Sequence, residues 1–185
     1  MYRLAICLLF AVSSQASAQV AADDYVKKAT RVETIRATHA LHKLHDLGGD
    51  WYFAGPFDNT NHNGFDAAYP PEKEVDLKAT YKGKNGETVA WKKYDTFALD
   101  KILDLTKLMS TQQHAVVYLY HETESKTAYS LPISLGSDDS ISVWANGTRV
   151  LHEDHSRPAY ADQNHVEWKL KPGKNTLLIK ITQYE

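Results

Sequence analysis

Two adjacent carboxylates, Asp138 and Asp139, stand immediately before a short alternating segment that runs from Ser140 to Ala145 and ends in Asn-Gly. Adjacent carboxylates repel each other, so holding both requires a cation, a positively charged side chain or backbone N–H groups nearby. Carboxylate oxygens suit calcium, whose ligands lie at about 2.3–2.6 Å. Aspartates in turns also accept hydrogen bonds from backbone N–H groups. The pair is therefore either part of a calcium site or a cap that ends one strand before the next begins.

Aromatic side chains are a second set of candidates, because the C–H faces of sugar rings pack well against tryptophan or tyrosine. Trp144 is out of phase with Ile141 and Val143, which belong to the expected core face, so it is the tryptophan most available either to a ligand or to a covering loop or helix. Tyr118 and Tyr120 share one face of another alternating segment, where a ligand or a covering segment could lie. The remaining tryptophans, Trp51, Trp91 and Trp168, are expected in the core.

Several kinds of catalytic chemistry find no support in the sequence. It contains no G-x-S-x-G element, no phosphate-binding glycine loop and no dinucleotide-binding fingerprint. The single cysteine, Cys7, lies in the N-terminal segment that we expect to be removed, so the mature chain would have no thiol nucleophile. These observations favour a binding or structural module over an enzyme.

Residues 1–18 have the pattern of a secretory signal peptide. One cation, Arg3, precedes an apolar run, and small residues at Ala16 and Ala18 form an A-x-A cleavage pattern. We expect a mature chain that begins near Gln19 and is periplasmic or secreted. No later apolar run approaches the roughly 20 residues that a membrane-spanning helix needs, so we expect no membrane span.

Composition indicates one globular domain of ordinary size. The chain has 185 residues, of which 43% are hydrophobic and 11% aromatic, and its formal net charge is -2. That charge provides no general field that would attract nucleic acid, so we expect no nucleic-acid partner.

The spacing of apolar residues divides the mature chain into a helical segment at 19–49 and a β domain at 50–185. Apolar residues at spacings near three and four predict a helix over 23–47, which Gly48 and Gly49 would end. Short alternating runs then predict strands at 51–54, 88–94, 115–122, 127–135, 140–145, 148–152, 165–170 and 176–182.

Turn residues support an antiparallel arrangement of these strands. Asn146 and Gly147 separate two alternating runs and suit the positive φ angles of a type I′ hairpin turn. Pro172 and Gly173 mark another reversal. Many short strands behind one helix predict a mainly β protein: an antiparallel β-sandwich preceded by an N-terminal helix.

The stretches "LGSDDSISVWANGTRV" and "LKPGKNTLLIKI" resemble the second half of galactose-binding-like jelly-roll domains of secreted bacterial proteins, among them carbohydrate-binding modules. "WYFAGPFDN" and "YPPE" are similar to the opening of the same domains, so the resemblance covers about residues 50–183. It implies a jelly roll. The chain departs from the pattern at Ser140, where the family usually has glycine.

The Asp-Asp stretch also resembles PA14-type sugar-binding domains, in whose lectin members such a pair holds calcium that binds sugar hydroxyls. This resemblance implies that Asp138 and Asp139 would be calcium ligands, with Asn164 as a possible third. The combined expectation is a non-catalytic extracytoplasmic carbohydrate-binding-like module, with ligand contacts from these aspartates and from Trp144, Tyr118 and Tyr120. The alternative is a structural or protein-interaction module whose partner is another extracytoplasmic protein.

Overall fold

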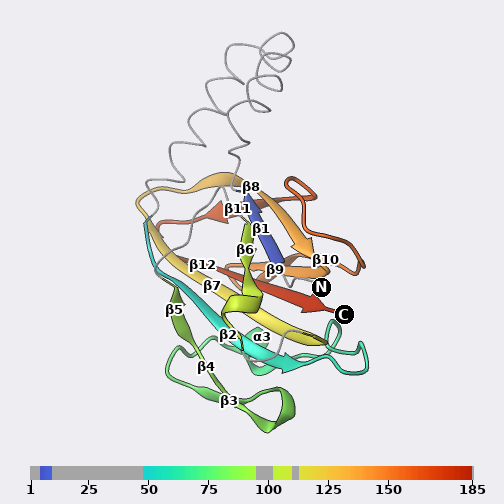
Figure 1. The fold of residues 1–185 in the computed structure, drawn as a ribbon. Helices are drawn as coiled ribbons and strands as arrows, with labels where there is room; N and C mark the ends of the chain where they lie inside the picture. Colours follow the sequence, from blue (N-terminus) through green and yellow to red (C-terminus); the bar gives the residue numbers. More distant parts are fainter. Residues whose placement is uncertain (1–4, 10–47, 95–101, 110–112, 185) are drawn as a thin grey trace.

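The computed structural model describes residues 5–9, 48–94, 102–109 and 113–184. Within these residues the protein is mainly β, and its strands pair antiparallel, as the sequence predicts (Figure 1). None of the helices in this part of the chain has the length and apolar character needed to span a membrane. The helix predicted over 23–47 lies outside the described residues.

The larger sheet has six strands in the order β10-β9-β12-β7-β2-β5. Its long central strands carry most of the apolar residues, and β2 and β7 extend several residues beyond their predicted ends. The bounds are β2 (Trp51–Asp58), β5 (Lys92–Tyr94), β7 (Ala115–Ser125), β9 (Ser140–Ala145), β10 (Thr148–Glu153) and β12 (Gly173–Gln183).

The smaller sheet has four strands in the order β11-β8-β1-β6. Its bounds are β1 (Ala5–Leu9), β6 (Ile102–Asp104), β8 (Tyr129–Asp138) and β11 (Asn164–Leu170). The strand β1 therefore falls inside residues 1–18, the segment whose sequence predicts a signal peptide. The sequence pattern gave no indication of β6.

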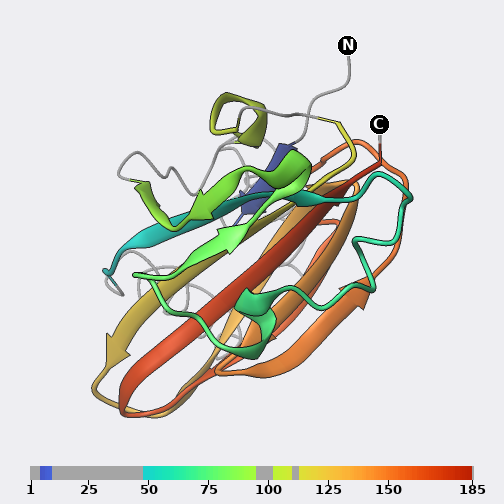
Figure 2. The same cartoon turned by 90° about the horizontal axis from the view of Figure 1, so that it is seen from below.

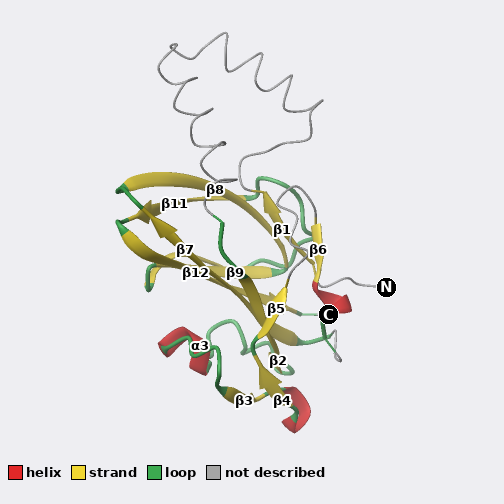
Figure 3. Ribbon diagram, turned by 90° about the vertical axis from the view of Figure 1, so that its left-hand side faces the viewer, coloured by secondary structure: helices red, strands yellow, loops and turns green. Residues whose placement is uncertain are grey.

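One apolar core joins the two sheets, which lie face to face in Figure 3. Alternate residues of each strand enter it, as the period of two requires. Leu131, Ile133 and Leu135 come from β8, while Ile141 and Val143 come from β9. The three tryptophans predicted to be core residues are buried: Trp51, Trp91 and Trp168.

A second apolar cluster lies on the other side of the six-stranded sheet. There the connection from β2 to β5 crosses the outer face, and it includes α3 (Pro70–Lys73), β3 (Thr80–Lys82) and β4 (Thr88–Ala90) (Figures 2 and 3). The buried members of this cluster are Ala54, Phe57, Val89, Trp91, Val116, Tyr118, Tyr120 and Leu178. The strand predicted over 88–94 is thus two strands, β4 and β5, separated by the buried Trp91.

A buried ion pair holds this connection on the sheet. The side chain of Lys180 in β12 is 1% exposed, and its ammonium group donates to Glu72 Oε1 at 2.7 Å. The same group donates to the carbonyl oxygens of Phe65 and Ala67 at 2.7 and 2.8 Å. Tyr118 donates its hydroxyl hydrogen to the same Glu72 oxygen. Burial lowers the pKa of Lys180, and the hydrogen bond to Glu72 opposes that shift.

The hairpin between β9 and β10 has the predicted turn. Asn146 and Gly147 have φ angles of 50° and 79°, as a type I′ turn requires. The Asn146 side chain adds tertiary contacts, because its Nδ2 donates to Lys169 O and its Oδ1 accepts from Thr176 N. The turn therefore also ties the hairpin to the β11–β12 reversal, where Gly173 has a φ of 87°.

The substitution Gly147→Val tests this turn. No atom lies within 4 Å of an added Cβ, so the expected loss comes from the positive φ and not from a clash. A β-branched residue there should destabilise the protein by more than about 1 kcal/mol in urea unfolding. Gly147→Asn is the matched control and should lose less, because asparagine tolerates the left-handed region. Equal stability of the valine variant and the parent would disprove the turn assignment.

Candidate functional site

A cleft of about 230 Å³ lies between the six-stranded sheet and the segment that contains α3. Trp144, Tyr120 and Leu178 contribute from the sheet. Residues 71–75 form the opposite wall, and the remaining lining residues are Gly147, Lys174 and Thr176. The cleft thus combines aromatic and aliphatic surface with charged groups from Glu72, Lys73, Glu74 and Lys174. This is the type of lining with which proteins bind small polar molecules that have an apolar face.

Trp144 is one of two cleft residues that the sequence identified as ligand contacts, the other being Tyr120. Its neighbours in β9, Val143 and Ala145, are buried in the core, whereas Trp144 points to the outer face and stays partly exposed. It lies at the edge of the outer apolar cluster and packs against it without being enclosed. The ring therefore offers part of its surface to the cleft.

The two tyrosines predicted as ligand contacts are both buried. Tyr120 is 5% exposed and lines the cleft, so a ligand could reach its edge. Tyr118 is 0% exposed, and its hydroxyl group donates to Glu72. It lies below the connection from β2 to β5, which we call the covering segment. Burial and the neighbouring Glu72 raise the pKa of Tyr118, which stays protonated as a hydrogen-bond donor. In this structure Tyr118 supports Glu72 and does not line the cleft.

Asp139 has the geometry of a cap. The residue is 6% exposed, and its two carboxylate oxygens accept hydrogen bonds from the backbone N–H groups of Arg157 and Tyr184, each at 2.9 Å. Its own N–H donates to Thr182 O at 3.2 Å. These bonds connect the start of β9 to the β10–β11 loop and to the end of β12. They favour the capping alternative of the sequence analysis.

Asn164, the proposed third calcium ligand, is also fully engaged. Its side-chain oxygen accepts from the guanidinium group of Arg157, and its Nδ2 donates to Glu153 Oε2 at 2.6 Å. The same guanidinium group donates to Ser137 Oγ at 2.9 Å. Arg157 thus supplies positive charge beside the Asp-Asp pair. The described residues contain no cluster of three or more histidine, cysteine, aspartate or glutamate side chains arranged to hold a metal ion.

The carboxyl group of Asp138 has a perturbed pKa. Burial, together with the charge of Asp139, raises the pKa of the Asp138 carboxyl group to about 7. This follows from the cost of removing a carboxylate from water and from like-charge repulsion. The protonated form of Asp138 is therefore favoured to a higher pH than that of an ordinary exposed aspartate.

The Asp-Asp pair and the cleft lie at opposite ends of β9. Trp144 lies five positions after Asp139, which at roughly 3.3 Å per residue places them about 16 Å apart along the strand. The structure therefore does not bring the predicted aspartates and the predicted tryptophan into one site. Of the six site residues predicted from sequence, Trp144 and Tyr120 line the cleft. The other four do not: Tyr118, Asp138, Asp139 and Asn164.

Ser142, His152 and Asp66 resemble a hydrolytic triad in composition. Ser142 Oγ lies 2.7 Å from His152 Nδ1, and His152 Nε2 lies 3.6 Å from Asp66 Oδ1. However, Ser142 is 0% exposed, and the ring of Phe65 stacks on His152 with 4.2 Å between the ring centroids. A nucleophile must reach its substrate, so this geometry does not suit acyl transfer. The three residues instead hold the covering segment on β9 and β10.

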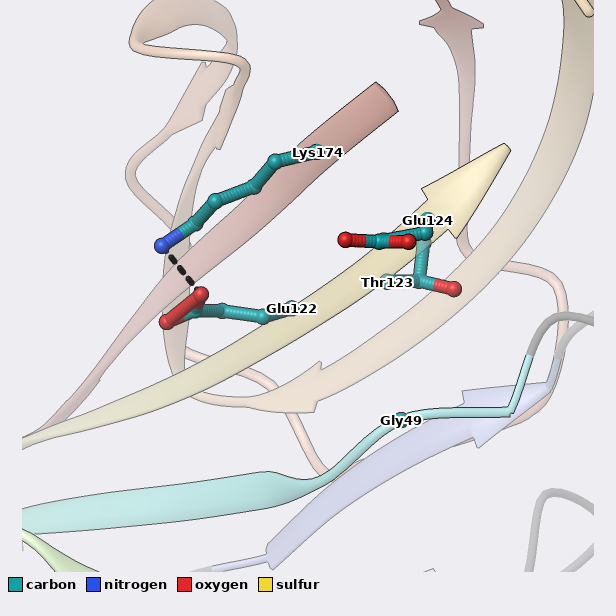
Figure 4. A pocket seen from close by; sticks show the side chains of 5 residues that line it. All are labelled: Gly49, Glu122, Thr123, Glu124 and Lys174. Carbon is teal, nitrogen blue, oxygen red and sulfur yellow. Dashed lines mark ion pairs between the residues drawn. The ribbon is translucent and has the colours of Figure 1, made fainter. Parts of the chain in front are cut away.

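A second hollow, of about 340 Å³, lies beside the start of β2 and the end of β7 (Figure 4). It is lined by Gly49, Glu122, Thr123, Glu124 and Lys174. The ammonium group of Lys174 pairs with Glu122, as the dashed line in Figure 4 shows. These lining residues offer no aromatic ring, so the Trp144 cleft is the better candidate for a sugar.

Comparison with known proteins adds no family assignment, since no family model, curated protein or solved structure matches the chain.

Replacing Asp139 tests its capping role. Asp139→Ala leaves the N–H groups of Arg157 and Tyr184 without acceptors, and each such loss costs about 1–3 kcal/mol. We therefore expect urea unfolding to show a loss of at least about 2 kcal/mol, and calcium to leave the melting temperature of the parent unchanged. Asp139→Asn keeps one acceptor oxygen and should lose less. Stabilisation of the parent by calcium that disappears in both variants would instead establish a metal site.

The raised pKa of Asp138 predicts a pH dependence of stability. A carboxyl group whose pKa is about 7 when folded and 3.8 when unfolded holds more protons in the folded state between those values. Its contribution therefore weakens the fold as the pH rises through that window. The test uses protein that retains β1, because this strand pairs with Asp138. In it, Asp138→Asn should unfold at higher urea concentration than the parent at pH 8, with little difference at pH 4. Parallel stability curves from pH 4 to 8 would contradict this assignment.

Proposed function

We propose that the protein is a non-catalytic, extracytoplasmic carbohydrate-binding module whose ligand lies in the cleft beside Trp144. The partly exposed Trp144 ring above a cleft with charged rim residues is the observation that carries this proposal. A tryptophan face packs against the C–H face of a sugar, while the exposed Lys73 and Glu74 can exchange hydrogen bonds with its hydroxyl groups. The leader-like residues 1–18 support an extracytoplasmic location.

The arrangement of the sheets also supports this proposal. Two antiparallel sheets on a shared core are compatible with the galactose-binding-like jelly roll that the motifs resemble. We include that fold family in the proposal, and calcium is not needed for it, because the groups around the cleft can bind a sugar directly. The capping bonds of Asp139 support a metal-free site.

A structural or protein-interaction module is the second candidate function. The observation in its favour is the covering segment, which buries Tyr118 and most of the outer face of the six-stranded sheet. A sheet face that is sealed in this way leaves a small area for a sugar. In this case the cleft would be a packing irregularity, and the protein would act through another surface.

Binding of glycans to variants of Trp144 distinguishes the two candidates. Glycan-array screening of the parent comes first, followed by titration of the glycan bound best. Trp144→Ala should weaken binding by at least about tenfold, because a buried aromatic contact is worth about 1.5–3 kcal/mol. Trp144→Phe keeps a ring and should lose less. A chelator should have no effect.

Tyr160→Ala is the matched control for removal of an aromatic side chain. Tyr160 is 64% exposed and belongs to the loop before β11, away from the cleft. This variant should bind the glycan as the parent does. Absence of any glycan binding by the folded parent, or binding that is insensitive to Trp144→Ala, would refute the carbohydrate proposal.

A further inference from the structure

The strand β1 has an unusual position for a segment with the sequence pattern of a leader. It lies inside the four-stranded sheet, between β8 and β6 (Figure 1). All of its residues pair with β8, from Ala5 opposite Asp138 to Leu9 opposite Ser134. On its other side it pairs with β6, with Ile6 opposite Leu103. Removal of residues 1–18 would therefore take out an internal strand of the sheet.

Such removal would leave backbone groups without partners on both sides of the gap. β6 pairs with no other strand in the described sheet. On β8, the carbonyl oxygen of Ser137 accepts from Arg157 Nε, and its N–H donates to Gln163 Oε1, so both groups point away from β1. Because successive strand residues point to opposite sides, the backbone groups of Gly136 and Asp138 face β1. An open edge of this kind is a template for another strand.

We propose that, once the leader is removed, the gap between β8 and β6 binds an extended apolar segment of a partner protein as an added β-strand. Main-chain hydrogen bonds to β8 would give affinity, and side-chain pockets at alternate positions would give specificity. This inference goes beyond carbohydrate binding and does not depend on the Trp144 cleft, which lies on the other sheet.

The structure indicates the chemistry of the partner segment. The occupant seen here is a five-residue run, AICLL, that is antiparallel to β8. Leu103 and Leu135, which lie opposite the second and fourth positions of this strand, are buried in the core, so a replacing strand needs apolar residues at those two positions. The residues in between face the other side of the sheet and can be small or polar.

A second copy of this chain fits the gap less well than a different protein does. The strands at the sheet edges that another copy could offer are β5, β10 and β11, together with β8 and β6 once β1 is removed. β5 has the sequence KKY and β10 has TRVLHE, while β11 alternates charged residues with apolar ones that fill its own core. The apolar residues of β8 also alternate with others and fill its own core, and β6 has three residues. An uninterrupted apolar run such as AICLL is absent from these edges. The structure thus favours a partner with an extended apolar segment.

Hydrogen exchange on exported protein tests the proposal directly. The protein is isolated from the periplasm or medium of a bacterial host, and its intact mass should show a start near Gln19. The amides of Gly136 and Asp138 should exchange freely. A synthetic peptide of residues 3–11 with Cys7→Ser should then slow their exchange by at least about tenfold and raise the melting temperature.

Variants of the peptide and of the protein separate strand addition from nonspecific binding. A peptide with Ile6→Asp and Leu8→Asp places charges opposite core residues and should give no protection. In the protein, Ser134→Pro removes an N–H that faces the gap and should weaken peptide binding at least about tenfold. Ser134→Ala loses the same hydroxyl bond to Asp162 but keeps the N–H, so it should bind the peptide as the parent does. Trp144→Ala should also bind it normally.

Three results would overturn the proposal. Exported protein that retains residues 5–9 would make β1 a permanent strand. Protection of Gly136 and Asp138 without peptide, in a monomer or in a dimer, would show that the chain itself or a second copy fills the gap. Failure of the peptide to protect these amides in the folded parent would show that the edge accepts no strand.

Discussion

The ammonium group of Lys180 is buried against the outer face of the six-stranded sheet, and much of the site geometry depends on how it is satisfied. A lysine ammonium has three N–H donors, and here all three have acceptors: Glu72 Oε1, Phe65 O and Ala67 O. Leaving such a charge buried without its partner would cost about 3–5 kcal/mol. The connection after β2 is therefore fixed over β12, with Glu72 and α3 in a defined place.

The position of the cleft follows from this constraint. Glu72 binds both Lys180 and Tyr118, so the chain at residues 71–75 approaches the sheet there and closes over Tyr118. Trp144 lies further along the face, at the edge of the covered area, and so it keeps an exposed surface. The same ion pair that removes Tyr118 from contact with ligands builds the wall that faces Trp144. The covering of Tyr118 and the shape of the cleft thus both follow from one interaction.

The sequence predicted the regular parts of this arrangement well. Period-two alternation identified the central strands, and Asn146 with Gly147 identified the hairpin, because both signals come from neighbours along the chain. It could not predict that Lys180 is buried, since a lysine in alternation normally marks a solvent face. Leu178 and the tyrosines of β7 were a usable signal that this face is covered. The partners of Asp139 lie 18 and 45 residues away, so its role as a cap required the fold.

The two sheets are closed in different ways, and the difference has a physical origin. The outer face of the larger sheet is covered by a connection that stays attached at both ends and is fixed by a buried charge. The gap in the smaller sheet is filled by β1, whose apolar run satisfies two physical requirements at once. A leader needs an apolar run to enter a membrane, and a strand between two sheet edges needs one to face a core. Sequence pattern alone does not separate these roles, because neither depends on a specific side chain. The structure adds the register of β1 between β8 and β6: because this strand pairs on both sides, its removal would leave two open edges.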